Sequence, residues 1–483
     1  MNKPSLNRKN VSCNEPKPIK IVQFGEGNFL RAFVGYAISE LNKFTNFNAG
    51  IAVVQPIDKG LIPVLNEQDG LYTLFMRGLK NGKAVNEVEL IDTIVKGINP
   101  YSDFNDFLEL GRTETLEFVI SNTTEAGISF ISSDTQDMRP PSSFPAKLTL
   151  FLLERYNWYK GDVSKGLTVI PCELINYNAD TLKAVILKYV DLWNLEGNFK
   201  NWIDKACTFH NTLVDRIVPG YPKHEIEYYN KQLNYSDKLI VTAETFFLWV
   251  IEGDERLKER LGFSKTGLEV KVVPDMQPFR TRKVRILNGA HTVMVPLSIL
   301  YGNTTVKETM DVDFTSNFVK QTVFDEIINT LEMDKNELVS FANATFERFQ
   351  NPYIVHNLSS IALNMISKFK VRVLPSLLSY FDKYGNIPTR LTFAFACLIR
   401  FYKGEYFGLS MPVNDDEHVT QKLSQIWQSN NNGKVAQEVL ESELFWGQDL
   451  TKIEGLKDAI ALALETIDGY GIEKGFESFN KSY

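Results

Sequence analysis

Three side chains, Lys283, Asn288 and His291, have the types and the spacing to act on a carbonyl group. They follow Pro278 in a stretch with helical periodicity, so we expect a helix with the proline in its first turn, where a missing N–H costs least. At ~100° per residue the three side chains fall on one side of such a helix. A lysine can exchange a proton, while an amide and a neutral imidazole can hold and polarise an oxygen. The trio suits interconversion of an alcohol and a ketone, although the spacing alone is more typical of a surface helix with an exposed Lys and a hydrogen-bonded His.

A glycine-containing loop near the N-terminus could supply the redox cofactor. The β-rich run 19–24 leads directly into Gly25-Glu26-Gly27, and apolar residues then recur at helical spacing. In a strand–loop–helix unit of this kind the glycines permit close backbone approach to a pyrophosphate, and the helix N-terminus faces the phosphates. Leu30 replaces the third glycine of the usual fingerprint, so the motif alone is weak.

Two further strand ends contribute to the same prediction. The strand predicted at 116–121 is followed by the small and polar residues Asn122, Thr123, Thr124 and Glu125. An open α/β sheet places its ligand just past such strand ends, although an ordinary helix cap has the same composition. The strand predicted at 50–55 ends in Gln55, where a carboxylate commonly binds the adenosine ribose. The nearest carboxylate, Asp58, comes three residues after the strand end. These residues therefore do not determine whether the protein prefers a nicotinamide cofactor with or without a 2′-phosphate on its adenosine ribose.

Composition limits the possible functions. The net charge of −7 over 483 residues argues against nucleic-acid binding, and the longest apolar runs are too short to cross a bilayer. No apolar signal core precedes residue 20, and the four cysteines have no paired spacing, which indicates reduced thiols in the cytoplasm. The histidines lack ligand spacing, so we expect no metal.

The periodicity changes along the chain, which predicts an α/β fold of two domains. Residues 1–277 are expected to form a Rossmann-type, doubly wound sheet domain with a hairpin inserted within 72–95. Residues 278–483 are expected to form an all-helical C-terminal domain that binds substrate. The predicted helices of this second domain cover 318–331, 338–349, 354–369, 373–380, 391–402 and 458–467.

The word Lys-x4-Asn-x2-His resembles the active-site signature of the mannitol dehydrogenase family, the polyol-specific long-chain dehydrogenases. The resemblance extends over nearly the whole chain and implies NAD as the cofactor. Gly25, Gly27 and Arg31 match the family pattern Gly-x-Gly-x-x-x-Arg, which implies that Arg31 binds phosphate; a surface ion pair is the alternative. The cofactor contacts implied in this way are Phe24, Gly25, Gly27, Asn28, Arg31, Asn122, Thr123 and Glu125.

Departures from the family pattern favour an acidic substrate. This chain departs from the pattern of the polyol-oxidising members at four positions. Leu174 stands where they have Asn, Arg280 where they have Glu, His356 where they have Asp, and Ser360 where they have Arg. The pocket thereby gains basic or proton-donating character, which suits a carboxylate. We expect Arg280, His356 and Lys368 to bind that carboxylate, and Asp215 to orient a hydroxyl; a structural Asp215–Arg216 pair is equally compatible.

The resemblance therefore implies a hexuronate or aldonate substrate, the D-tagaturonate/D-altronate pair, with Lys283 as general acid and base. The alternatives are D-fructuronate, a neutral polyol, a different Rossmann dehydrogenase with a helical second domain, or a nucleotide sensor without chemistry. We expect a monomer or a small homo-oligomer.

Overall fold

The computed structural model describes residues 3–80, 82–124 and 126–482. The chain divides into two compact units, one formed by Met1–Gly78 with Ala84–Met276 and the other by Leu79–Lys83 with Gln277–Tyr483. Each unit has its own core.

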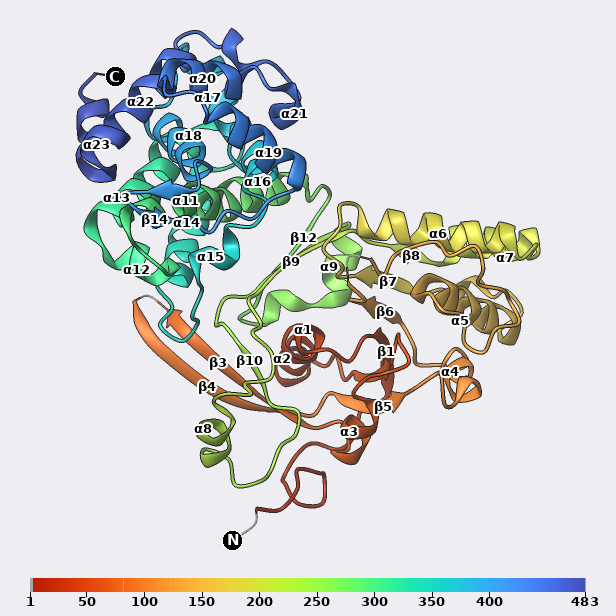
Figure 1. Ribbon diagram of the computed structural model, residues 1–483. Coiled ribbons are helices and arrows are strands. Elements are labelled where there is room, and N and C mark those ends of the chain that lie inside the picture. The colour runs from red at the N-terminus through yellow and green to blue at the C-terminus, as the bar shows by residue number, and fades with distance from the viewer. Residues whose placement is uncertain (1–2, 81, 125, 483) are drawn as a thin grey trace. The chain divides into compact units, whose positions relative to one another are not determined.

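A parallel sheet of six strands forms the centre of the first unit (Figure 1). Its strands are β1 (Ile19–Phe24), β2 (Gly50–Val54), β5 (Ile94–Ile98), β6 (Phe118–Ser121), β7 (Thr168–Pro171) and β8 (Thr208–Phe209). Their order is β5-β2-β1-β6-β7-β8, and every neighbouring pair is parallel. Numbered along the chain without the inserted hairpin, this is the order 3-2-1-4-5-6 of dinucleotide-binding sheets.

Helices cover both faces of this sheet. Alternating residues of β1 point to opposite sides, with Ile21 in one apolar cluster and Val22 in the other. The continuous helix α1-η1-α2, with a π-helical turn in its middle, contributes to the first cluster, and α4 to α7 contribute to the second. Their bounds are α1 (Asn28–Leu30), η1 (Arg31–Gly35), α2 (Tyr36–Phe44), α4 (Phe104–Leu110), α5 (Phe144–Trp158), α6 (Asn178–Leu192) and α7 (Gly197–Ala206). The doubly wound α/β prediction is confirmed.

Smaller elements extend the first unit. One sheet has the order β10-β3-β4 and another has the order β12-β11-β9. Their bounds are β3 (Tyr72–Lys80), β4 (Lys83–Ile91), β10 (Val241–Ala243), β9 (Thr212–Asp215), β11 (Leu248–Glu252) and β12 (Glu269–Val273). The remaining helices are α3 (Ile62–Glu67), η2 (Val163–Lys165), α8 (Ile226–Lys231), α9 (Glu255–Leu261) and η3 (Phe263–Lys265). Strands β3 and β4 are the expected insertion.

Helices dominate the second unit. The first are α10 (Gln277–Arg282), η4 (Lys283–Asn288), α11 (Gly289–Tyr301), α12 (Val306–Asp311), α13 (Asp313–Gln321), η5 (Thr322–Ile327), η6 (Ile328–Thr330), α14 (Lys335–Phe349), α15 (Leu358–Ile361) and α16 (Met365–Arg372). The others are α17 (Leu374–Tyr384), α18 (Thr389–Phe401), α19 (Glu417–Ile426), α20 (Asn432–Leu440), α21 (Glu443–Trp446), η7 (Leu450–Lys452), α22 (Leu456–Tyr470) and α23 (Ile472–Asn480). Two short strands, β13 (Glu405–Tyr406) and β14 (Leu409–Ser410), pair with each other. Helix α18 is buried from Leu391 to Phe401 and packs against α11 and α22, so it forms the centre of this unit.

The predicted long helix over 354–369 is wrong. The chain is irregular before α15 and breaks again before α16, where Asn364 adopts the left-handed conformation with φ +52°. Asparagine tolerates this conformation, which ends one helix and starts the next at a new angle. Within the residues that the structure describes, no helix is long and apolar enough to span a membrane.

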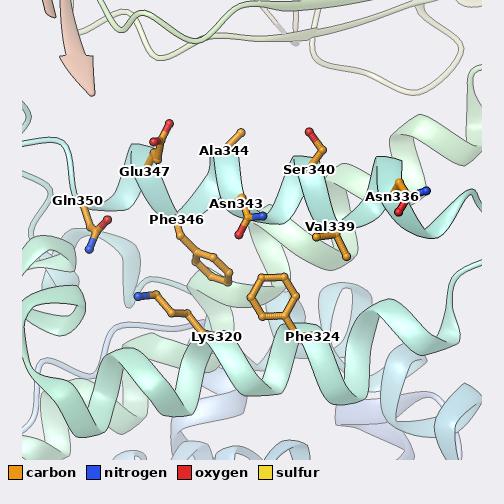
Figure 2. Close-up of a pocket in the computed structure, with 10 residues that line it drawn as sticks. All are labelled: Lys320, Phe324, Asn336, Val339, Ser340, Asn343, Ala344, Phe346, Glu347 and Gln350. Carbon is orange, nitrogen blue, oxygen red and sulfur yellow. The ribbon is translucent and has the colours of Figure 1, made fainter. Parts of the chain in front are cut away.

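An open groove of about 750 Å³ lies on the second unit between α14 and the helix formed by α13 and η5 (Figure 2). The rings of Phe324 and Phe346 meet at its floor with a centroid distance of 5.6 Å. Its other lining residues are Lys320, Asn336, Val339, Ser340, Asn343, Ala344, Glu347 and Gln350. None of these is a residue for which the sequence predicts catalysis or binding.

Candidate active site

Lys283 and Asn288 are the two ends of a π-helical turn, η4. The sequence predicts an α-helix here, in which residues five apart differ by ~140° around the axis. A π-helix bonds residue i to residue i+5, so Lys283 and Asn288 instead lie one turn apart along the axis. The helix resumes α-helical geometry at Gly289 and carries His291 in its next turn. Single π turns occur often at functional sites, which makes this departure from the expected helix informative.

Neighbouring helices hold the π turn on two sides. The buried Arg282 guanidinium lies 4.3 Å from the Phe341 ring centroid and 3.6 Å from a Glu337 carboxylate oxygen, both on α14. On α16, the carbonyl oxygen of Arg372 would lie 3.3 Å from a Cβ at Gly289, a tight contact. The glycine therefore lets α16 approach the start of α11 closely, and the turn has little freedom to shift.

The three predicted catalytic side chains are all half-buried. Within the described part of the chain, the side-chain amide of Asn288 makes no hydrogen bond, so its donors and acceptor are available to a ligand. The His291 ring packs on Phe349, with 4.2 Å between centroids, and lies 5.3 Å from the His356 ring. The fold thus brings His356, predicted to bind substrate, beside a predicted catalytic residue.

Basic groups surround the same turn. Lys368 lies on α16, which packs against η4 and α11, and its Nζ donates to the Ile361 carbonyl at 2.8 Å. Burial lowers the pKa of Lys368, and the Arg372 cation lowers it further, while Asp415 acts in the opposite direction. Burial also lowers the pKa of His356, which favours its neutral form.

Arg280 and Arg285 add to this basic character. Arg280 lies on α10, three residues before Lys283, and is half-buried. Burial lowers the pKa of the Arg285 guanidinium to about 10, and its Nη1 donates to the Ser376 hydroxyl at 2.9 Å. Partly desolvated cations of this kind are stabilised by an incoming anion.

In the first unit, the glycine loop has a shape that fits a dinucleotide. Gly25 has φ +115°, and a Cβ there would lie 2.9 Å from the Asn122 carbonyl oxygen, so only glycine suits this position. A Cβ at Gly27 would meet no described atom within 4 Å, which leaves open space beside the backbone. No described side chain caps the helix that starts at Asn28, so its first N–H groups remain available to phosphate oxygens.

Two of the predicted cofactor contacts have a different environment from the one expected. The Phe24 ring is fully buried and packs on Phe144, with 4.9 Å between centroids, so only its backbone can reach a ligand. Arg31 is 2% exposed, donates to the Glu26 carbonyl at 3.2 Å and to the Asn28 side chain at 2.7 Å, and also bonds to the Leu239 carbonyl. Arg31 is therefore not a surface ion-pair partner; its guanidinium holds the loop backbone and Asn28 in place, and its contact with phosphate stays a prediction.

Glu173 organises the second predicted loop and is not among the residues predicted from the sequence. Its Oε1 accepts hydrogen bonds from the Thr123 backbone N–H at 3.0 Å and from the Thr123 hydroxyl at 3.1 Å, and its Oε2 accepts from Ser121 at 3.0 Å. Asn122 donates to the Cys172 carbonyl at 2.7 Å. Burial raises the pKa of the Glu173 carboxyl. The available signal was an acidic residue two positions after β7; Glu125 lies outside the described residues.

The remaining predicted positions lie at the ends of other strands. Asp215 is the buried last residue of β9. Arg216 donates to the Glu244 carbonyl at 3.0 Å and to the Ala32 carbonyl at 2.6 Å, so its guanidinium links these two backbone segments. Leu174 is 59% exposed and carries no hydrogen-bonding group. Among the described residues, no group of His, Cys, Asp or Glu is arranged to hold a metal ion.

Comparisons with known proteins add an independent line of support. Residues 19–265 match the mannitol dehydrogenase Rossmann domain, and residues 275–468 match the mannitol dehydrogenase C-terminal domain. An altronate oxidoreductase of Bacillus subtilis (strain 168) is 46% identical over 464 residues, 96% of this chain and 95% of that protein. An altronate oxidoreductase of Yersinia pestis bv. Antiqua (strain Nepal516) is 44% identical over 482 residues, 99% of this chain and all of that protein.

Solved structures show the same fold. A substrate-free D-sorbitol dehydrogenase superposes with a TM-score of 0.81 at 19% identity, over 98% of this chain and all of that one. The Pseudomonas fluorescens mannitol 2-dehydrogenase, in a ternary complex with NAD and D-mannitol, superposes with a TM-score of 0.67 at 19% identity, over 99% of this chain and all of that one. The predicted resemblance is confirmed, and the chain belongs to the mannitol dehydrogenase family.

Proposed function

We propose that this protein is an NAD-dependent oxidoreductase that interconverts D-altronate and D-tagaturonate. The observation that carries the proposal is that Lys283, Asn288 and His291 are all half-buried on and after the π turn. The side-chain amide of Asn288 makes no hydrogen bond within the described chain and can bind a ligand. The full-length relatives named altronate oxidoreductase support the choice of substrate. We further propose that residues 1–277 hold the cofactor and residues 278–483 the substrate.

The cofactor supplies hydride chemistry when it is bound, and the glycine loop and the loop of Asn122 and Thr123 would hold it. As the carbonyl carbon of the substrate receives hydride, the ammonium group of Lys283 gives a proton to the carbonyl oxygen. In the oxidation direction the neutral amine takes the hydroxyl proton. Asn288 and His291 donate hydrogen bonds to the substrate oxygens and stabilise the charge that develops there.

The substrate's carboxylate is the group that the basic residues around η4 would recognise. Lys368 and Arg280 supply charged donors, and the neutral His356 ring supplies an N–H beside His291. Charge-assisted hydrogen bonds of this kind are stronger than neutral ones, so a neutral polyol should bind less well. Asp215 is proposed to orient a substrate hydroxyl.

The decisive experiment follows NADH oxidation with D-tagaturonate, D-fructuronate and D-fructose as separate substrates. We expect strong preference for D-tagaturonate. Replacing Lys283 with Met should lower kcat/KM for D-tagaturonate by about 10²- to 10⁴-fold, the usual contribution of a general acid.

Lys307→Met is the matched control. Lys307 lies on the exposed side of α12, where its Nζ pairs with Asp311 at 2.5 Å, so its loss should leave kcat/KM unchanged. Full activity of Lys283→Met at every pH would refute the acid–base role. Equal or better turnover of D-fructuronate or D-fructose would refute the proposed substrate while leaving the fold and the lysine chemistry intact.

A further inference from the structure

The middle residue of the Gly-x-Gly loop, Glu26, has a buried carboxylate with spare hydrogen-bonding capacity. Its residue surface is 7% exposed. Its Oε1 accepts a hydrogen bond from the Leu61 backbone N–H at 3.3 Å, and the carboxylate also accepts from the backbone N–H of Glu26 itself. An ionised carboxylate can accept about four hydrogen bonds. Burial raises the pKa of Glu26, which reflects this incomplete compensation.

The carboxylate reaches from β1 toward the turn that follows β2. Strands β1 and β2 are parallel neighbours, with Phe24 paired to Val54, so both turns leave the same edge of the sheet. A Cβ at Gly60 would lie 2.1 Å from Glu26 Oε1, so the glycine leaves room for the carboxylate. This is the region in which an NAD-binding Rossmann domain places the acidic residue for the adenosine ribose, normally supplied by the second strand itself.

The two polar residues that follow β2, Gln55 and Asp58, are less suited to bind the ribose. Gln55 is 1% exposed, and its amide nitrogen donates to the carbonyls of Ile57 and Asp58 at 2.8 and 2.9 Å. The Gln55 side chain therefore stabilises the turn that follows β2. The side chain of Asp58, which lies in that turn, is exposed, which makes it the competing carboxylate.

We propose that Glu26 binds the 2′,3′-diol of the cofactor's adenosine ribose and thereby sets the preference for NAD(H) over NADP(H). The inference rests on the proposed function, because it requires a nicotinamide dinucleotide on the glycine loop. The two ribose hydroxyls donate to the carboxylate oxygens. A 2′-phosphate would instead bring negative charge against a carboxylate that has little solvent to screen it.

The test measures the dissociation constants of NADH and NADPH by isothermal titration calorimetry, without substrate. We expect Glu26→Gln to weaken NADH binding by about 10- to 100-fold, as loss of charged hydrogen bonds does. NADPH binding should stay constant or improve, because repulsion is removed. Glu26→Asp keeps the charge and should keep the preference for NADH. Asp58→Asn is the matched control and should change neither constant.

Several outcomes would overturn the inference. Equal weakening of both cofactors by Glu26→Gln would make Glu26 a support of the loop and nothing more. A changed NADPH-to-NADH ratio in Asp58→Asn but not in Glu26→Gln would assign the ribose to Asp58. If the wild-type protein bound neither cofactor, the proposed function would fail first, which separates the two failures. Circular dichroism melting of each variant confirms that a folded protein is compared.

Discussion

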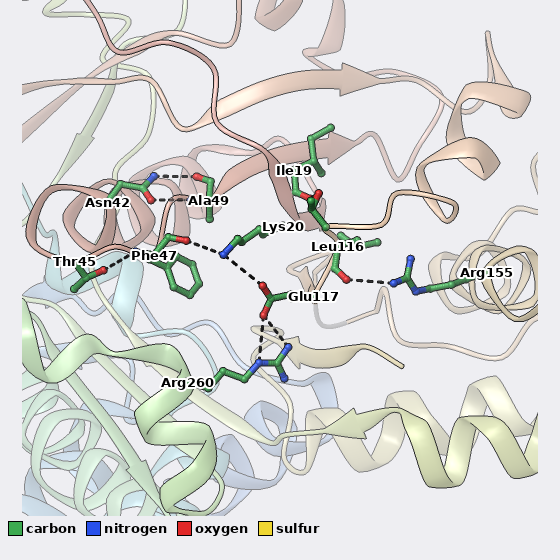
Figure 3. Close-up of polar contacts among 11 residues, drawn as sticks. Ile19, Lys20, Asn42, Thr45, Phe47, Ala49, Leu116, Glu117, Arg155 and Arg260 are labelled. Carbon is green, nitrogen blue, oxygen red and sulfur yellow. Dashed lines mark hydrogen bonds and ion pairs between the residues drawn. The ribbon is translucent and has the colours of Figure 1, made fainter. Parts of the chain in front are cut away.

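The two ends of the six-stranded sheet use charged side chains in opposite ways. At the amino ends of the strands, the charges are matched by fixed partners (Figure 3). Glu117 pairs with Lys20 at 3.4 Å and with Arg260 at 3.0 Å, and Arg155 donates to the Leu116 carbonyl at 3.3 Å. At the carboxyl ends, the Glu26 carboxylate accepts hydrogen bonds only from backbone N–H groups among the described residues, those of Leu61 and of Glu26 itself, and no cation pairs with it directly.

This difference separates stability from binding. Charges that are matched within the protein stabilise it but have little left to offer a ligand. Polar groups at the carboxyl ends hold loops in place and can still accept hydrogen bonds from a ligand, as expected of the sheet edge at which α/β proteins bind ligands. Variants at the amino end should therefore change stability alone, and variants at the carboxyl end should change cofactor affinity.

The largest expected effect on stability comes from Arg155→Met. The buried guanidinium donates to the carbonyls of Lys165, Gly111, Thr113 and Leu116 at 2.6 to 3.3 Å, and methionine leaves these acceptors unmatched. Because each lost hydrogen bond costs about 1 kcal/mol, we expect the free energy of unfolding to fall by about 3–5 kcal/mol. Urea denaturation measures it. NADH affinity of the folded protein should not change; a weakened affinity would break the comparison.

Glu173→Gln should have a smaller effect on stability and a larger one on binding. The glutamine keeps the shape, but its NH2 group opposes one of the donors from Ser121 or Thr123. We expect the free energy of unfolding to fall by about 1–2 kcal/mol. The displaced loop should weaken NADH binding by about tenfold, measured by calorimetry. Unchanged NADH affinity would show that this loop does not contact the cofactor.

The pH dependence of stability gives Glu173→Gln a second readout. Burial raises the pKa of Glu173 in the folded state, so the folded protein holds this proton more tightly than the unfolded chain does. Stability from this group is therefore greatest below the unfolded pKa of about 4.3 and declines as the pH rises through the window above it. The wild-type protein should show this decline in urea denaturation, and the glutamine variant should show less of it. Parallel curves would contradict the assignment.

The parts predictable from sequence were those fixed by local pattern. Strand β1 has the predicted bounds, 19–24, because an apolar β-rich run ends at a glycine turn. The break at Asn364 was missed, since apolar residues on both sides continue a helical period and the left-handed residue is tolerated by many sequences. The π turn was also missed, because packing of η4 between neighbouring helices is not a local property.

Long-range contacts explain the rest of the site. His291 and His356 are 65 residues apart, and only the packing of α11 beside the irregular chain before α15 brings their rings within 5.3 Å. The family resemblance identified both residues but could not give their geometry. Glu173 was overlooked because its partners, Ser121 and Thr123, belong to the neighbouring strand end, about 50 residues earlier in the chain.

The smallest expected effect belongs to Arg260→Met at the amino end. Arg260 donates to Glu117 at 3.0 Å and to the Thr168 hydroxyl at 2.7 Å, but its side chain is 43% exposed. Water and salt screen such a pair, so we expect the free energy of unfolding to fall by about 0–1 kcal/mol, with less effect in high salt. NADH affinity should match the wild type. A loss of affinity here would show that the amino end also shapes the cofactor site, and the division between a stabilising end and a binding end would have to be abandoned.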